Sequence, residues 1–222
     1  MTAMYYKEWI KTRWYLLLAF LTLMGFTGYS MLRFNRALGL KGAEHLWEVM
    51  MTRDAIFVEL LTYIPVLIGI VLALVQFVPE MHRKCLKLTL HLPCPHQRML
   101  YEMLSFGVVA LFVVFGISFL TLYFCLSGPL APELWSHVLL TTLPWYLAGI
   151  AAYLLLSWIC LEPTWKMRVF NLIITLLILR IYFLSSIPEA YNCFLPALTV
   201  FTLLTGSFSS LSIQRFKEGK QD

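Results

Sequence analysis

The residues best suited to chemistry lie between positions 80 and 98, in the segment EMHRKCLKLTLHLPCPHQR. It holds three of the five histidines and two of the five cysteines, and imidazole and thiolate are ligands that zinc and copper prefer. The candidate metal ligands are His82, Cys85, His91, Cys94 and His96. On one helix, His82 and His91 would point in opposite directions, because nine residues make about two and a half turns. We therefore favour the alternative, in which these side chains pack at a membrane interface or in a partner's groove.

The same segment is basic, which raises the possibility of nucleic-acid binding. Its basic residues are Arg83, Lys84, Lys87 and Arg98. The whole chain, however, is 60% hydrophobic and only 13% charged, whereas soluble domains are about half apolar and a quarter charged. This is the composition of a membrane protein, and cytoplasmic loops of such proteins are normally basic. We expect no nucleic-acid partner.

Six segments are long and apolar enough to cross a bilayer, which takes about 20 residues in a helix. The predicted spans cover residues 14–32, 56–78, 104–126, 137–161, 169–187 and 191–213. The sequence therefore predicts an all-α integral membrane protein with a single transmembrane domain, residues 1–222.

The basic residues predict the orientation of these spans. With six spans both termini lie on one side of the membrane, together with Lys7, Lys11, Arg13, Arg83, Lys84, Lys87, Arg98, Lys166, Arg168, Arg215, Lys217 and Lys220. The opposite side holds Arg33, Arg36, Lys41 and Arg53. By the positive-inside rule both termini face the cytoplasm, and we expect a multi-pass protein of the cell membrane, the inner membrane of a bacterium.

Three segments outside the spans are amphipathic. Residues 1–13 mix aromatic and basic side chains, as in an interfacial helix, although a flanking tail with ordinary membrane anchors fits as well. Residues 43–53 predict a short helix on the outer side. Between Glu80 and Leu92 the leucines fit either a helix or a strand. We favour a helix, because a lone strand would leave its backbone unpaired, and Pro93 would end it.

Charges and prolines inside the predicted spans are further candidates. Arg180 lies past the middle of the fifth span, where a charge is costly, so it is a functional candidate together with Glu59. The alternatives for Arg180 are snorkelling to the headgroups or a structural pair with Glu189 or Glu59. Three prolines could each kink a span or open a cavity by freeing a carbonyl group: Pro65, Pro144 and Pro196.

Enzyme signatures are missing from the sequence. It contains no G-x-x-x-x-G-K-[ST] loop, no H-E-x-x-H motif and no G-x-S-x-G elbow. We expect no enzymatic activity from this chain alone, and if ATP is used, another chain must bind it.

The organisation resembles that of the permease subunits of type-2 ABC exporters. Members have an interfacial N-terminal helix, six spans, and a cytoplasmic coupling helix between the second and third spans. In the family's loop an acidic residue is followed by leucines, a proline and a basic residue, which Glu80, the leucines at 86, 88 and 92, Pro93 and Arg98 match here. Lys84 and Cys85 stand where Gly and Thr are usual.

This resemblance implies how the protein would work. Two permeases, identical or related, would pair around a pathway, and a separate subunit would bind ATP and Mg, leaving this chain without a cofactor. The helix over 80–92 would contact that subunit through Glu80, Met81, Arg83, Lys84, Cys85, Lys87, Leu88 and Leu92. Two alternatives are a secondary carrier or channel, and a membrane enzyme or assembly factor that uses the His/Cys loop.

Overall fold

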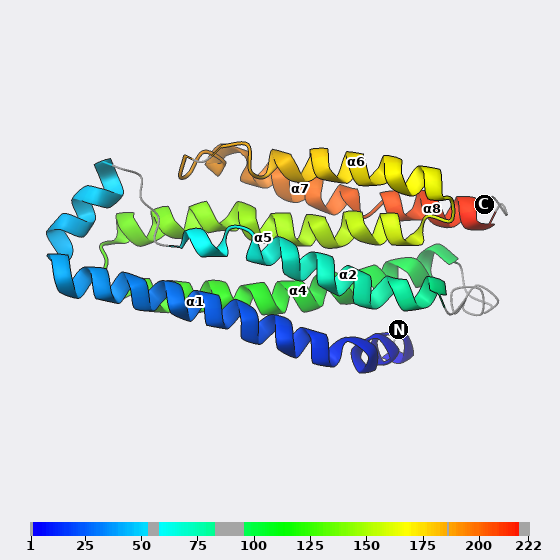
Figure 1. Ribbon diagram of the computed structural model, residues 1–222, viewed down its shortest axis with the longest axis horizontal. Coiled ribbons are helices and arrows are strands. Elements are labelled where there is room, and N and C mark those ends of the chain that lie inside the picture. Colours follow the sequence, from blue (N-terminus) through cyan, green and yellow to red (C-terminus); the bar gives the residue numbers. More distant parts are fainter. Residues whose placement is uncertain (1, 53–57, 83–95, 186, 218–222) are drawn as a thin grey trace.

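The computed structural model describes residues 2–52, 58–82, 96–185 and 187–217, and over these ranges every regular element is helical. The elements are α1 (Thr2–Thr52), η1 (Glu59–Leu61), α2 (Ile64–His82), α4 (His96–Ser127), α5 (Pro132–Leu161), α6 (Trp165–Ile181), η2 (Asn192–Phe194), α7 (Leu195–Thr205) and α8 (Phe208–Lys217). The long helices run side by side, with the start of α1 and the end of α8 at the same end of the bundle (Figure 1). The predicted all-α class is confirmed.

Five helical stretches in the described part of the chain are long and apolar enough to cross a membrane. They are Met4–Leu40, Glu59–Met81, Gln97–Ser127, Pro132–Leu161 and Asn192–Arg215. The fifth predicted span, 169–187, corresponds to α6, which has 17 residues. At 1.5 Å per residue α6 is about 25 Å long, less than the roughly 30 Å of a hydrocarbon core.

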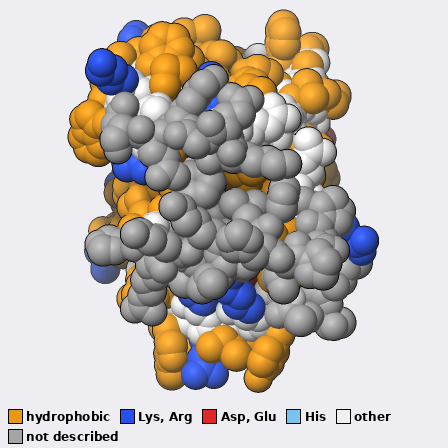
Figure 2. All heavy atoms as spheres, turned by 90° about the vertical axis from the view of Figure 1, so that its right-hand side faces the viewer, with side chains coloured by type: hydrophobic (Ala, Val, Ile, Leu, Met, Phe, Trp, Pro, Cys, Tyr) orange, Lys and Arg blue, Asp and Glu red, His pale blue; other side chains and the backbone are white. Residues whose placement is uncertain are grey.

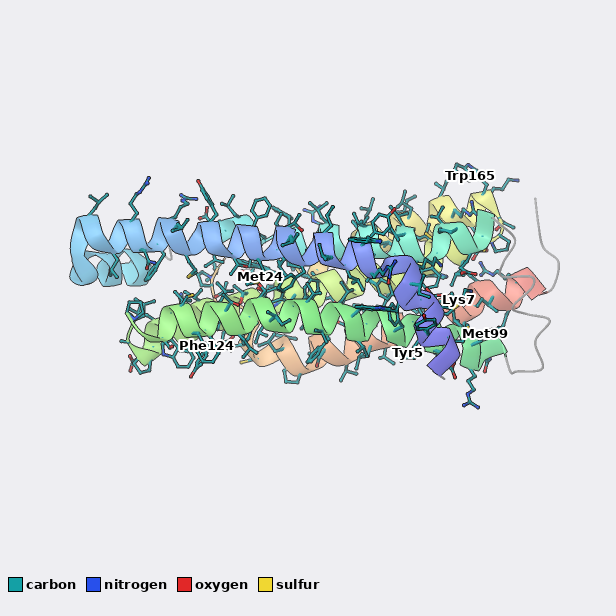
Figure 3. All side chains as sticks on the ribbon, turned by 90° about the horizontal axis from the view of Figure 1, so that it is seen from below. Tyr5, Lys7, Met24, Met99, Phe124 and Trp165 are labelled. Atoms are coloured by element: carbon teal, nitrogen blue, oxygen red, sulfur yellow. The ribbon has the colours of Figure 1, made fainter. Side chains whose placement is uncertain are left out.

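Helix α1 replaces three expected segments. Residues 2–52 form one continuous helix of 51 residues, which contains nearly all of the interfacial stretch 1–13, the span 14–32 and nearly all of the outer amphipathic stretch 43–53. The first proline of the chain is Pro65, so nothing in this stretch removes a helical hydrogen bond. The first turns of α1 bend toward the start of α4 (Figure 3), where Tyr5 donates or accepts a 2.6 Å hydrogen bond with Ser105.

Helix α5 lies at the centre of the bundle. It contacts α2, α4, α6, α7 and α8, and all residues from Ala148 to Leu155 are buried, so no face of this stretch is left for lipid. It begins with Pro132 in its first turn and ends at Leu161, because Pro163 keeps Glu162 out of the helical conformation. The outward faces of α4 and α6 expose large apolar residues instead, such as Phe112, Phe124, Leu176 and Leu177.

The crossing of α2 and α5 depends on two glycines. A Cβ atom added at Gly69 would lie 2.1 Å from the carbonyl oxygen of Gly149, and one added at Gly149 would lie 2.6 Å from that of Pro65. The two backbones therefore touch, as in membrane helices that pack through small residues.

The prolines act differently from one another. Pro65 and Pro196 stand in the first turns of α2 and α7, shortly after the 3-10 turns η1 and η2, where a missing N–H is tolerated. Pro144 lies inside α5. The predicted last span, 191–213, begins with η2 and is divided into α7 and α8 at Gly206.

We predict that Gly69→Ala destabilises the bundle, because the new methyl group forces α2 away from α5. The free energy of unfolding should fall by about 1–3 kcal/mol, measured by thermal or denaturant unfolding of the purified protein in detergent. Gly116→Ala is the matched control, since an added Cβ there meets nothing within 4 Å. An equal response of the two variants would contradict the close α2–α5 contact.

Candidate functional site

Glu80 lies at the end of α2, three residues before the segment 83–95, and is held by two lysines of α1. The Nζ atoms of Lys7 and Lys11 lie 2.9 and 3.1 Å from its Oε1 atom, and the Glu80 side chain is only 4% exposed. Both lysines come from the turns of α1 that bend toward the bundle. The stretch that the sequence analysis assigned to the membrane surface therefore supplies the partners of the acidic residue at the end of the second predicted span.

Gln76 extends this contact to two more helices. Lys11 also donates a hydrogen bond to the Gln76 carbonyl oxygen, one turn before Glu80. The Gln76 side-chain amide donates to the carbonyl oxygen of Met103 in α4 at 2.9 Å and accepts from the Tyr153 hydroxyl of α5 at 2.8 Å. We call Lys7, Glu8, Lys11, Gln76, Glu80 and Tyr153 the inner polar cluster. It connects α1, α2, α4 and α5.

Glu8 is the second acidic member of the inner polar cluster. Its side chain is fully buried, and neither carboxyl oxygen forms a hydrogen bond within the described residues. Lys11 Nζ lies 3.7 Å from its Oε2 atom. The cluster thus places two buried glutamates beside two partly exposed lysines, and removing one partner leaves a buried charge uncompensated.

A second buried carboxylate joins the neighbouring helices at the same end. Glu162, just beyond α5, is fully buried and accepts hydrogen bonds from the hydroxyl groups of Ser212 and Thr164. The guanidinium of Arg215 lies 3.5 Å from its Oε1 atom, and Arg168 donates to its carbonyl oxygen at 2.7 Å. Glu162 therefore ties the start of α6 and the end of α8 to α5.

This end of the bundle is also where the basic residues gather. Figure 2 views it directly and shows several Lys and Arg side chains between apolar surfaces. The described residues at the starts of α1, α4 and α6 and at the end of α8 include Lys7, Arg13, Arg98, Lys166, Arg168 and Arg215. Arg33 and Arg36 lie farther along α1, toward the opposite end. The structure thus brings together residues that the sequence analysis assigned to one side of the membrane.

Most of the predicted partner contact lies outside the described residues. Glu80 and Met81 belong to the last turn of α2. The structure does not describe Arg83, Lys84, Cys85, Lys87, Leu88 and Leu92, nor the candidate metal ligands His91 and Cys94 and the side chains of His82 and His96. Within the described ranges, no group of three or more His, Cys, Asp or Glu residues is placed to hold a metal ion.

The expected pairs of Arg180 are not formed. Arg180 lies exposed in the last turn of α6 and makes no salt bridge with another described residue. Glu189 is instead 2.9 Å from Nδ1 of His137 and accepts a 3.1 Å hydrogen bond from Asn192, while Glu59 is exposed. Neither carboxylate that was considered as a structural partner is thus paired with Arg180 in the described residues.

Several of these residues were not identified from the sequence as candidates. Gln76 is a polar residue within the second predicted span, which is itself a signal of a buried interaction. Glu8 precedes Lys11 by three residues, a spacing that places both on one face of a helix. Nothing local in the sequence distinguishes Glu162 or His137 from ordinary loop and interface residues, because their partners come from distant helices.

The inner polar cluster links the end of α2 to three other helices. Comparisons with protein-family models, curated proteins and solved structures gave no match.

We predict that Glu80→Gln strongly destabilises the protein, because Lys7 and Lys11 lose their shared carboxylate. The free energy of unfolding in detergent should fall by about 3 kcal/mol. Glu102→Gln is the control, since Glu102 pairs with the exposed Arg98 of its own helix at 3.2 Å and should cost only about 0.5 kcal/mol. Similar losses in both variants would show that Glu80 is no more than a surface charge.

Proposed function

We propose that this chain is the permease subunit of an ATP-driven exporter of the type-2 ABC class. The observation that supports this function best is the attachment of Glu80 to Lys7 and Lys11. Glu80 begins the segment that resembles the family's coupling helix. A push on that segment would reach α1 through the lysines, and would reach α4 and α5 through Gln76.

The proposed mechanism divides the work between two chains. A separate subunit binds ATP and Mg and receives the segment 80–92 in a surface groove. Met81, Cys85, Leu88 and Leu92 form the apolar face of this contact, and Arg83, Lys84 and Lys87 make ion pairs at its rim. Burial of the apolar face contributes most of the affinity, because exposed ion pairs are weak. Closure of the ATP-binding subunit then displaces the segment and the helices attached to it.

The proposed topology has six crossings and both termini in the cytoplasm of the cell. The basic residues at the starts of α1, α4 and α6 support this orientation. In this arrangement α6 is the fifth crossing, the stretch containing α7 and α8 is the sixth, and a second permease completes the pathway.

We predict that an ATP-binding subunit associates with this chain. A tagged copy of this chain, purified in mild detergent, should retain a Walker-motif ATPase that mass spectrometry identifies. Leu88→Asp should abolish this association, because it places a charge in the middle of the apolar face, while membrane insertion is unchanged. Leu184→Asp is the control, since Leu184 is exposed beyond the end of α6, away from the termini.

The result distinguishes an error in the proposed function from an error in the assigned contact face. If no ATPase accompanies the unmodified chain in repeated preparations, the proposed function is wrong. If the ATPase accompanies the Leu88→Asp variant in full amount, only the assignment of the contact face is wrong.

A second prediction concerns orientation. Cys193 is exposed in η2, at the end of the bundle opposite the termini, whereas Cys94 belongs to the proposed cytoplasmic loop. In variants with a single cysteine, a membrane-impermeant maleimide added to intact cells should label Cys193 but not Cys94. Cys94 should react only after the membrane is permeabilised. The reverse pattern would overturn the proposed topology.

A further inference from the structure

Residues of η1, of α5 and of the segment that follows α6 line a polar pocket. The segment that follows α6 lies at the end of the bundle away from both termini (Figure 1). The volume of the pocket is about 260 Å³, just below the usual range of small-molecule sites, so it suits a small ligand. Two carboxylates and four aromatic rings line it: Glu59, Glu189, Tyr63, Trp145, Phe183 and Tyr191. No Lys or Arg is among the described residues that line it.

The carboxylate of Glu189 is held in a fixed position. It lies 2.9 Å from His137 Nδ1 through one oxygen and accepts a 3.1 Å hydrogen bond from Asn192 through the other. Its backbone N–H donates to the Thr141 hydroxyl at 3.3 Å. Its φ angle is 60°, in the left-handed region that glutamate rarely adopts. These contacts maintain an unfavourable backbone conformation, as is common at binding sites.

Glu59 supplies a charge without a structural role. Its side chain is exposed and forms no hydrogen bond or salt bridge with another described residue, although its backbone carbonyl accepts hydrogen bonds from the N–H and hydroxyl groups of Thr62, just after η1. Because it lines the pocket without a partner, its negative charge is available to a ligand.

Pro144, inside α5, belongs to the wall of the pocket. Proline has no N–H, so the carbonyl group of Leu140, four residues earlier in α5, lacks its usual helical donor. Both residues line the pocket. The proline that the sequence analysis noted in the fourth span therefore frees the carbonyl oxygen of a residue in the pocket wall from its helical hydrogen bond.

The aromatic residues form a second part of the wall. The rings of Tyr63 and Phe183 lie 5.3 Å apart, and Trp145 and Tyr191 line the same pocket. The Tyr191 hydroxyl accepts from the backbone N–H of Leu184 at 2.9 Å and donates to the Ile181 carbonyl oxygen at 2.8 Å, which fixes its ring. Aromatic faces attract organic cations such as quaternary ammonium groups.

We propose that this pocket binds a small soluble alkylammonium ligand, with Glu59 and Glu189 providing the charge and the aromatic rings contacting the alkyl groups. The lining favours this class over a phospholipid headgroup, since no described Lys or Arg is present to bind a phosphate. The lining also favours an alkylammonium ligand over a metal ion, since no described group of three His, Cys, Asp or Glu residues is placed to bind a metal. The site does not depend on the proposed transport function.

Choline is a suitable probe, because its neutral isostere 3,3-dimethylbutan-1-ol has nearly the same shape without the charge. The full-length protein in a phospholipid-free detergent should bind choline with a Kd on the order of 1 mM, seen as a rise in Tm and a change in tryptophan fluorescence. The neutral isostere should produce neither change. Glu59→Gln should weaken choline binding about three- to tenfold without changing the Tm of the free protein.

Glu133→Gln is the matched control, because Glu133 is an exposed glutamate at the same end of the bundle that does not line the pocket. The proposal is wrong if choline and its isostere bind equally well. It is also wrong if Glu59→Gln binds choline as tightly as the unmodified protein, or if the folded protein does not bind choline. In nanodiscs, competition from phosphatidylethanolamine would overturn the assignment to a soluble ligand. None of these binding assays requires an ATPase. A negative choline result therefore does not contradict the proposed transport function, and the absence of an ATPase does not contradict the proposed pocket.

Discussion

The backbone contact between α2 and α5 governs how the other helices are placed. Gly69 and Gly149 bring the two helices close enough that side chains beyond the crossing can reach across it. Tyr153, one turn after Gly149, meets Gln76, two turns after Gly69. In α4, Gly107 leaves room for the Tyr153 hydroxyl, which a Cβ atom at this position would approach to 2.0 Å. The glycines thus bring together the donors and acceptors of the inner polar cluster.

Polar groups are distributed along the bundle according to their charge. In the middle, Thr27 of α1, Ser118 of α4 and Tyr146 of α5 are joined by hydrogen bonds of 2.9 and 3.0 Å, so neutral groups satisfy one another where no water is present. The buried carboxylates Glu80 and Glu162 lie at the end of the bundle, beside basic side chains. A charge is less costly there, because its partners can reach water and headgroups.

The sequence was sufficient to predict the helical class and most of the apolar helices, because length and hydropathy are local properties. The continuity of α1 was not predicted, since a change in composition near residue 13 signals a change of surroundings and not a break in backbone hydrogen bonding. The positions of Pro65 and Pro196 in first helical turns were not predicted, because single-sequence boundaries do not define where each helix begins. The contact of His137 with Glu189 was missed because it joins residues 52 positions apart.

The lysine partners of Glu80 in the candidate site were missed for the same reason, their distance in the sequence. The acidic residue Glu80 was identified from its place beside a leucine-rich loop, but two complete predicted spans separate it in the sequence from its two lysine partners. Only the folded arrangement, in which α1 bends toward α4, brings them within 3.1 Å of its carboxylate. Residues that pair across such distances cannot be recognised from spacing.

The length of α6 has a consequence for the surrounding lipid. A helix of 17 residues that crosses a bilayer falls about 5 Å short of a typical hydrocarbon core. Such hydrophobic mismatch is relieved by local thinning of the membrane, which draws headgroups and water toward the end of the short helix. The exposed Arg180 stands in that last turn, and Phe183 and Glu189 of the polar pocket follow it. The lipid next to α6 would then be thinner than elsewhere around the protein, which would place both the arginine and the pocket within reach of the aqueous phase.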